Sequence, residues 1–298
     1  MILRIFILTA GGITCYSRNF FPQDSDYTME DLIGGFLSAL DGFAQELKGG
    51  GIRGLNFKNF NFFYEKDDTY DMIFVIVVDT EDLEEEAREK LTLMKNEFIR
   101  RYGKKLENFS GCVSDFDDFN GFVEEHIFIP PKILLVGQQG VGKTTIMNLF
   151  PGETIVELDE DMNERIQKTI IVEGLDFIKK FNLREIDLNE LVKKSKLYQK
   201  YLNTVDVLCI ITNSRGTNLG ETKKLYERLE KKIQKPDVYI IANYQDQKSI
   251  AFAPEKIENF FESKTYGFSA IQTNAKERMF EIILEILQIS VINKIKDN

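Results

Sequence analysis

Near the middle of the chain, eight residues fit the pattern Gly-x-x-x-x-Gly-Lys-Thr, and this motif constrains the fold more than any other feature of the sequence. An apolar run at residues 133–136 precedes it. Backbone N–H groups of such a loop surround phosphate oxygens, the lysine reaches the β- and γ-phosphates, and the threonine hydroxyl ligates Mg²⁺. The sequence therefore predicts a strand, a phosphate-binding loop and a helix, with Lys143 and Thr144 as the candidate catalytic residues. The expected nucleotide-binding residues of this loop are Gly137, Gln138, Gln139, Gly140, Val141, Gly142, Lys143, Thr144 and Thr145.

The acidic charge of the chain is concentrated in its first part. The whole chain has 298 residues and a net charge of −10. Residues 1–129 carry 13 Lys and Arg against 24 Asp and Glu, a net charge of −11, whereas the remainder has a net charge of +1 (25 against 24). Because nucleic acids and anionic lipids need a basic surface, both are disfavoured as partners of the acidic part. Solubility alone would explain the acidity equally well.

The composition indicates neither a membrane protein nor an oxidising compartment. No apolar run approaches the roughly 20 residues of a transmembrane helix. Arg4 interrupts the apolar start of the chain, which therefore reads as a strand rather than a signal peptide. Three cysteines and one histidine, without metal-ligand spacing, argue against a Cys/His metal site. We expect a cytoplasmic protein and, since no lipidation motif is seen, at most indirect membrane contact.

Two adjacent prolines, Pro130 and Pro131, separate an acidic helical stretch from the strand that leads into the glycine-rich loop. Such a connection is short and stiff. The length of the chain also favours two domains. We therefore expect one domain at residues 1–129 and a second at residues 130–298.

The first domain shows the pattern strand, strand, helix, strand, strand, helix, helix. A two-glycine turn at residues 11–12 joins the first two strands. After the first helix, strands are expected at residues 55–65 and 72–78, and the phenylalanines of the former read as core rather than as a ligand surface. Helical spacing gives the expected buried faces of the two long helices as Leu32, Phe36, Leu40, Phe43 and Leu47, and Leu83, Ala87, Leu91, Met94 and Phe98.

This order of elements resembles the longin domain, which also forms the N-terminal part of the signal recognition particle receptor α-subunit and of several trafficking proteins. A roadblock-type domain, built from a related α/β layering, is the alternative. Neither domain needs an active site, and the acidic groups at residues 67–71 and 84–86 read as solvated surface. The resemblance implies that residues 1–129 bind a protein partner.

The second domain alternates strands and helices in the way that a mostly parallel sheet flanked by helices requires. The fold class is therefore α/β in both domains. Strands are expected at residues 133–136, 169–172, 183–186, 205–212, 238–242 and 268–272, and helices near residues 219–232, 254–261 and 277–289. ATPases and GTPases with this loop share such a sheet, so the order alone does not identify the base.

The base is indicated by the four residues that directly follow the strand at 238–242. Asn243 and Asp246 frame the sequence Asn-Tyr-Gln-Asp, which resembles the Asn-Lys-x-Asp element of small GTPases, especially the Arf and signal recognition particle receptor β-subunit branch. A carboxylate can accept hydrogen bonds from both N1–H and the exocyclic amine of guanine, and adenine lacks this pair of donors. The resemblance assigns base recognition to Asp246 and loop bracing to Asn243, while Tyr244 replaces the lysine.

Residues 273–276, Thr-Asn-Ala-Lys, resemble the Ser-Ala-Lys element of the same family, with Asn274 in place of the serine. The alanine amide of that element contacts the guanine O6. By this resemblance, Ala275 and Lys276 belong to the guanine site. The resemblance to small GTPases covers residues 132–290.

Two further elements concern the metal and hydrolysis. Asp187 matches the aspartate of the family's Asp-x-x-Gly element, which reaches Mg²⁺ through water, but Glu190 occupies the glycine position. Leu191 stands where related proteins carry a water-orienting glutamine, and leucine cannot orient water. The threonine that senses Mg²⁺ and the γ-phosphate is best matched by Thr169, with Thr154 as the alternative. The expected metal ligands are therefore Thr144, Thr169 and Asp187.

These observations favour a GTP-binding switch of the small GTPase superfamily that hydrolyses GTP slowly or with the help of a partner. GTP or GDP and Mg²⁺ are the expected ligands. A protein partner would bind through the switch regions or the longin-like domain, and the longin-like domain could dock on its own or another chain's G domain, the latter as a homodimer. The alternative is a non-catalytic scaffold with structurally bound GTP or GDP. An ATPase is disfavoured by Asp246.

Overall fold

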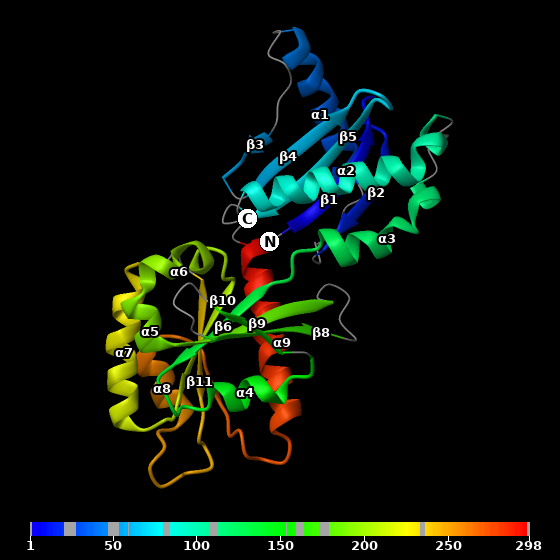
Figure 1. The fold of residues 1–298 in the computed structure, drawn as a ribbon. Coiled ribbons are helices and arrows are strands. Elements are labelled where there is room, and N and C mark those ends of the chain that lie inside the picture. Colours follow the sequence, from blue (N-terminus) through cyan, green and yellow to red (C-terminus); the bar gives the residue numbers. More distant parts are fainter. Residues whose placement is uncertain are drawn as a thin grey trace. The chain divides into compact units, whose positions relative to one another are not determined.

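The computed structural model describes residues 2–20, 28–46, 54–58, 60–79, 84–107, 113–152, 154–158, 164–172, 179–232 and 236–296 (Figure 1). The chain divides into two compact units, and the division lies between Ile129 and Pro130. Within the described parts of the chain, no helix combines the length and the apolar character needed to cross a bilayer.

The N-terminal unit is built on a five-stranded antiparallel sheet with the order β2-β1-β5-β4-β3. The central strand β5 is buried along its whole length, which explains its unbroken apolar sequence. The strands are β1 Ile2–Thr9, β2 Thr14–Asn19, β3 Gly54–Asn56, β4 Phe60–Asp67 and β5 Met72–Asp79. The helices are α1 Thr28–Glu46, α2 Glu84–Leu106 and α3 Phe119–Phe122, with a 3₁₀ turn at Val113–Phe116 and a π-helical turn at Val123–Ile127.

Two expectations for this unit need correction. The single strand expected at residues 55–65 is two strands, β3 and β4, which form a hairpin. The expected buried face of α1 is also wrong, because Phe36 and Phe43 are 50% and 59% exposed while Leu37 and Ala44 are buried. Gly34 explains the rotation of the helix: it lies so close to the backbone of the β1–β2 turn that a Cβ there would overlap it. The expected face of α2 is confirmed from Ala87 to Phe98, and Leu32, Leu47 and Leu83 lie outside the described side chains.

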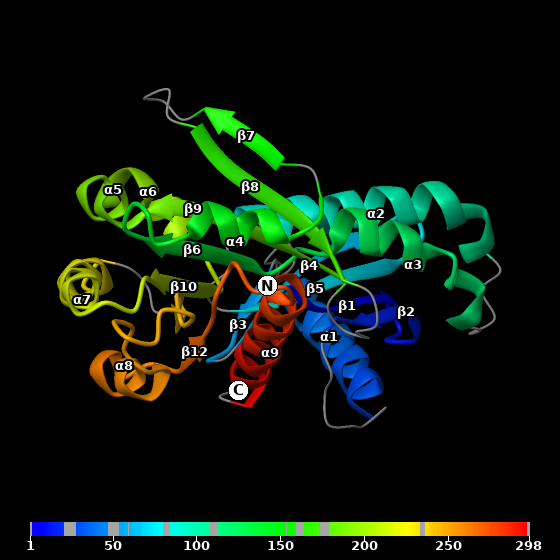
Figure 2. The same cartoon turned by 90° about the horizontal axis from the view of Figure 1, so that it is seen from below.

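The C-terminal unit is built on a seven-stranded sheet with the order β12-β11-β10-β6-β9-β8-β7. Strands β12, β11, β10, β6 and β9 are parallel, and the β7–β8 hairpin continues the sheet antiparallel at one edge (Figure 2). The strands are β6 Lys132–Gly137, β7 Thr154–Leu158, β8 Glu164–Ile171, β9 Lys180–Asp187, β10 Val207–Thr212, β11 Asp237–Ala242 and β12 Thr265–Gly267. The helices are α4 Lys143–Leu149, α5 Leu188–Lys193, α6 Ser195–Leu202, α7 Gly216–Glu230, α8 Pro254–Phe261 and α9 Ala275–Lys296.

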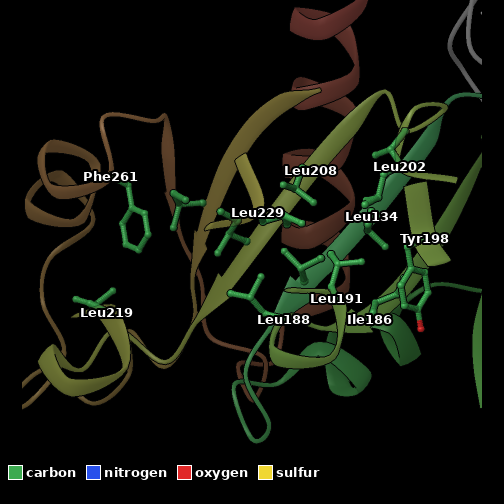
Figure 3. Close-up of a cluster of buried hydrophobic side chains, with 14 of the residues drawn as sticks. Leu134, Ile186, Leu188, Leu191, Tyr198, Leu202, Leu208, Leu219, Leu229 and Phe261 are labelled. Atoms are coloured by element: carbon green, nitrogen blue, oxygen red, sulfur yellow. The ribbon is translucent and has the colours of Figure 1, made fainter. Parts of the chain in front are cut away.

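Helices cover both faces of this sheet. Helices α5, α6, α7 and α8 share one apolar cluster with strand residues such as Leu134 and Leu208 (Figure 3). Helices α4 and α9 pack against each other and against the opposite face. Since successive strand residues point to opposite faces, Ile186 in the cluster places its neighbours Glu185 and Asp187 on the α4 face.

The mostly parallel sheet flanked by helices confirms the expected architecture of this unit, but three of its elements differ from the prediction. The strand expected at residues 268–272 lies earlier, at β12 Thr265–Gly267. Strand β7 was not predicted. Helices α5 and α6 follow β9 directly and were not predicted.

Candidate nucleotide-binding site

The glycine-rich loop joins β6 to α4 at the carboxyl end of the parallel strands. Gly140 and Gly142 have φ angles of +79° and +99°, a region that residues with a Cβ rarely adopt. A Cβ on Gly142 would also overlap the side-chain amide of Asn243, and one on Gly137 would lie 2.6 Å from the Ile211 carbonyl oxygen. The loop therefore needs its glycines both for backbone conformation and for close packing, and the predicted strand, loop and helix are confirmed.

A cleft of about 680 Å³ opens over this loop. Its size falls within the range of roughly 300–1,000 Å³ typical of small-molecule sites. The lining comes from the glycine-rich loop, the start of α4, the end of β9, helix α5, Ile166 of β8, Tyr198 and Tyr244. These elements meet because the carboxyl ends of the parallel strands lie at the same edge of the sheet.

Lys143 is the cation of the cleft. Its Nζ donates hydrogen bonds to the carbonyl oxygens of Gly137 and Gln138, at 2.8 and 2.9 Å, and lies 3.8 Å from Oδ2 of Asp187. Burial lowers the pKa of Lys143, and the nearby carboxylates of Asp187 and Glu185 oppose this effect. Because a half-buried ammonium is costly without anions around it, the position favours a phosphate ligand.

The oxygen groups suited to a divalent cation gather beside Lys143. The Thr144 hydroxyl donates a hydrogen bond of 2.9 Å to Oε1 of Glu185. Asp187 caps helix α5, since its Oδ1 accepts from the N–H groups of Asn189 (2.9 Å) and Glu190 (3.2 Å). Hydroxyl and carboxylate oxygens are the ligands that Mg²⁺ prefers, so these residues fit a magnesium site. Sequence reasoning missed Glu185, although its position two residues before Asp187 on one strand places both side chains on the same face.

Asn243 joins the base-side loop to the phosphate loop. Its Nδ2 donates to the Val141 carbonyl oxygen at 3.0 Å, and its Oδ1 accepts from the N–H groups of Tyr244 (2.9 Å) and Ala270 (3.2 Å). Tyr244 has a φ angle of +66°, and its hydroxyl donates to the Gly140 carbonyl oxygen at 3.0 Å. The loop after β11 is therefore fixed against the loop after β6.

A smaller cavity of about 90 Å³ adjoins the cleft on the base side, and Tyr244 lines both. Asp246, Ser269 and Ala270 line it, and the Ser269 hydroxyl donates to Oδ1 of Asp246 at 2.6 Å. This donor orients the carboxylate and leaves its other oxygen without a described side-chain donor. Asp246 thus meets residues that the sequence analysis did not assign to the site.

The structure does not bring Ala275 and Lys276 to either cavity. They are the first residues of α9, where Ala275 is buried and Lys276 is exposed. The reason is the position of β12: it ends at Gly267, so the loop that follows starts at Phe268 and carries Ser269 and Ala270 into the site. The Ser-Ala dipeptide immediately after a strand was the signal that could have identified these residues.

Thr169 is also placed away from the cleft. Strand β8 runs antiparallel to β9 with Thr169 opposite Asn182, and the Thr169 hydroxyl donates to Oδ1 of that residue at 2.9 Å. Asn182 precedes Asp187 by five residues along β9, a distance on the order of 16 Å. Thr154 lies opposite Lys168 and is similarly remote. This placement does not support either threonine as a metal ligand.

The segment after Asp187 is a helix that is anchored in the core. Leu191 is fully buried in the apolar cluster of α5, α6, α7 and α8 (Figure 3). The Glu190 side chain lines the cleft and accepts a hydrogen bond of 2.7 Å from the Tyr198 hydroxyl, and Lys194 Nζ lies 3.7 Å from the same oxygen.

The seven-stranded sheet, the glycine-rich loop and its helix define a P-loop α/β domain.

No protein-family model matches the sequence, and no curated protein matches it. Two similar solved structures are the cytosolic domain of the FeoB iron transporter of T. maritima in its GMPPNP form and the FeoB G-domain of Methanococcus jannaschii. The first is 17% identical with a TM-score of 0.41, and the match covers 52% of this chain and 63% of that chain, less than two thirds of its length. The second is 18% identical with a TM-score of 0.37, covering 55% of this chain and 99% of that chain.

Proposed function

We propose that residues 130–298 bind a guanine nucleotide together with Mg²⁺, and that the chain acts as a GTP-binding switch of the small GTPase type. The observation that carries this proposal is the position of Asp246. Its carboxylate lines the cavity that adjoins the phosphate cleft, next to the Ala270 amide. Guanine presents two adjacent donors, N1–H and the exocyclic amine, to such a carboxylate, whereas adenine lacks this pair.

On the phosphate side, each residue has a defined role in the proposal. Lys143 and the N–H groups of the glycine-rich loop hold the β- and γ-phosphates. Thr144 and Asp187 hold Mg²⁺, which neutralises phosphate charge when it is bound. The hydrogen bonds that Lys143 now makes to loop carbonyl oxygens keep its ammonium at the floor of the cleft.

Slow or partner-dependent hydrolysis is the second part of the proposal. The Glu190 N–H group already donates to Asp187 and is not available to the γ-phosphate, and the Leu191 side chain is buried, so it cannot orient a water molecule in the cleft. An arginine or a water-positioning side chain from a partner would supply what is missing. The same observations favour the second candidate function, a scaffold that keeps GTP or GDP as a structural ligand.

For residues 1–129 we propose a longin-like domain that binds protein, in a trafficking or protein-targeting assembly. The proposal is supported by the sheet order β2-β1-β5-β4-β3, by one helix between β2 and β3, and by helices after β5. Its partner would be a G domain, either its own or that of another chain in a homodimer, or an unrelated protein.

The test of guanine recognition is a change of base preference. In Asp246→Asn, two hydrogen bonds to a charged acceptor are lost, each contributing about 1.5–3 kcal/mol, so GDP affinity should fall at least about 100-fold. Xanthosine diphosphate carries a carbonyl where guanine has the amine, and it should bind the variant better than GDP. Isothermal calorimetry with GDP, ADP and xanthosine diphosphate measures this, with Glu281→Gln on the exposed surface of α9 as the control. Equal GDP and ADP affinity in the wild type would refute the guanine assignment.

The two candidate functions differ in turnover. The nucleotide retained on purification should be identified, and phosphate release should then be followed on the same preparation. Repeated turnovers that vanish in Lys143→Ala support the switch, whereas retained GTP without release supports the scaffold.

A further inference from the structure

Glu185 is a second carboxylate at the phosphate end of the site. In the parallel pairing of β6 with β9, Glu185 lies opposite Leu135, two positions before the pair of Gly137 with Asp187. Both acidic side chains therefore project on the α4 face, where Thr144 stands in the first turn of the helix. Glu185 lines the cleft together with Thr144 and Asp187.

The hydrogen bond between Thr144 and Glu185 fixes the direction of the hydroxyl. A threonine hydroxyl has one proton and two lone pairs. Oε1 of Glu185 takes the proton at 2.9 Å, so the lone pairs of the Thr144 oxygen remain available to a cation. A hydroxyl that turned its proton toward the cleft would instead repel the cation.

The other oxygen of Glu185 has no hydrogen-bond partner in the described part of the chain, although it is buried. A buried carboxylate oxygen left in this way costs free energy unless a cation, a water molecule or a donor satisfies it. Mg²⁺ usually keeps several of its water molecules when it binds to a protein. A water molecule bound to the metal would satisfy the Glu185 oxygen from within the cleft.

The carboxylate of Asp187 has different partners from that of Glu185. Its Oδ1 accepts two N–H groups at the start of α5, and its Oδ2 lies 3.8 Å from the Lys143 ammonium. Asp187 thus fixes α5 and faces Lys143, whereas Glu185 accepts the hydrogen bond from the Thr144 hydroxyl. The two carboxylates have separate partners and separate tasks.

We propose that Glu185 is a positioning residue of the magnesium site, which orients the Thr144 hydroxyl and accepts a hydrogen bond from a metal-bound water molecule. The inference deepens the proposed function and rests on guanine-nucleotide binding at this cleft. It predicts that Glu185 determines how strongly Mg²⁺ slows nucleotide release.

The experiment measures the release rate of a fluorescent GDP analogue at a series of free Mg²⁺ concentrations, and again in EDTA. In Glu185→Gln, which keeps the size and the acceptor for Thr144, the Mg²⁺ concentration for half-maximal slowing should rise about tenfold or more. In EDTA the variant should still bind and release the GDP analogue, which shows that it is folded. Asp187→Asn provides a comparison at the second carboxylate, and Glu281→Gln is the matched surface control.

The possible results distinguish a failure of the role proposed for Glu185 from a failure of guanine-nucleotide binding. If Glu185→Gln needs the same Mg²⁺ concentration as the wild type, the inference is overturned and guanine binding stands. If the wild type binds GDP but its release is indifferent to Mg²⁺, the inference is overturned as well. If the wild type binds no guanine nucleotide at all, the proposed function itself fails. A metal dependence shifted in Glu185→Gln but not in Glu281→Gln supports the inference.

Discussion

Placing a glutamine at position 191 should destabilise the protein rather than activate it. The sequence resemblance to small GTPases suggests that Leu191→Gln would supply a water-orienting side chain. In this structure, however, Leu191 is fully buried with Leu188 and Tyr198 in the cluster beneath α5 and α6 (Figure 3). The amide would enter apolar surroundings and would not reach the cleft.

The size of the effect follows from two terms. Loss of the buried leucine costs about 1.5–3 kcal/mol, and a buried amide without a partner costs a further ~1–3 kcal/mol. The free energy of unfolding should therefore fall by about 2.5–6 kcal/mol, if the two terms add. For a domain of this size, 1 kcal/mol corresponds to about 2–4 °C in Tm, so a decrease of about 5–24 °C is expected.

Thermal melts followed by circular dichroism, with GDP and Mg²⁺ at fixed concentration, measure this change. Leu197→Gln on α6 is the matched control, because Leu197 is 43% exposed and its substitution should stay within about 0.5 kcal/mol. Leu191→Met, which nearly conserves volume, should cost less than about 1.5 kcal/mol. The reasoning is refuted if Leu191→Gln melts within about 2 °C of the wild type, or if it hydrolyses GTP faster at an unchanged Tm.

Three other outcomes are expected. Gly142→Ala should lower GDP affinity about 100-fold. A positive φ angle costs a residue with a Cβ about 1–2 kcal/mol, and the added Cβ would overlap the Asn243 amide, whose displacement would leave a buried polar group unpaired at about 1–3 kcal/mol. An unchanged affinity by calorimetry would contradict this. Burial lowers the pKa of Lys143, so the folded state holds this proton less tightly than the unfolded chain does. The free energy of unfolding of the nucleotide-free protein should therefore rise as the pH increases toward 10.5, the ordinary pKa of a lysine. Denaturant titrations across this range should show a flatter rise in Lys143→Met. Burial also raises the pKa of the thiols of Cys15 and Cys209, so peptide mapping after alkylation should find both unmodified until the protein is unfolded.

The parts of the site that sequence reasoning predicted are those specified by a few neighbouring residues. The glycine-rich loop is one, since its positive φ angles and its close contacts both require glycine at fixed spacing. Asn243 and Asp246 are another, because they directly follow a strand, β11, whose apolar run is unambiguous. In both cases the local sequence determines where the strand ends and therefore what reaches the edge of the sheet.

The misassigned residues depend on information that is not local. The sequence predicted Ala275 at the base side, where the structure has Ala270, because β12 has only three residues and pairs with one neighbour, so its apolar signal is weak. Thr169 was placed at the metal because its distance along the chain fits, but the antiparallel register of β8 with β9 carries it to the far end of the strand. Glu185 carries no motif, and only the packing of α4 on β9 reveals its partner. Register and packing are tertiary properties, and one-dimensional spacing does not determine them.

The three bonds of the Asn243 side chain all end on main-chain atoms, the carbonyl oxygen of Val141 and the N–H groups of Tyr244 and Ala270. A brace of this kind places no demand on the side chains of the residues it joins. The side chains at positions 141 and 270 can therefore change while the amide continues to hold the backbones, but position 142 must stay glycine because a Cβ there would overlap the Asn243 amide. One buried asparagine thus fixes the relative position of the two loops through main-chain atoms alone.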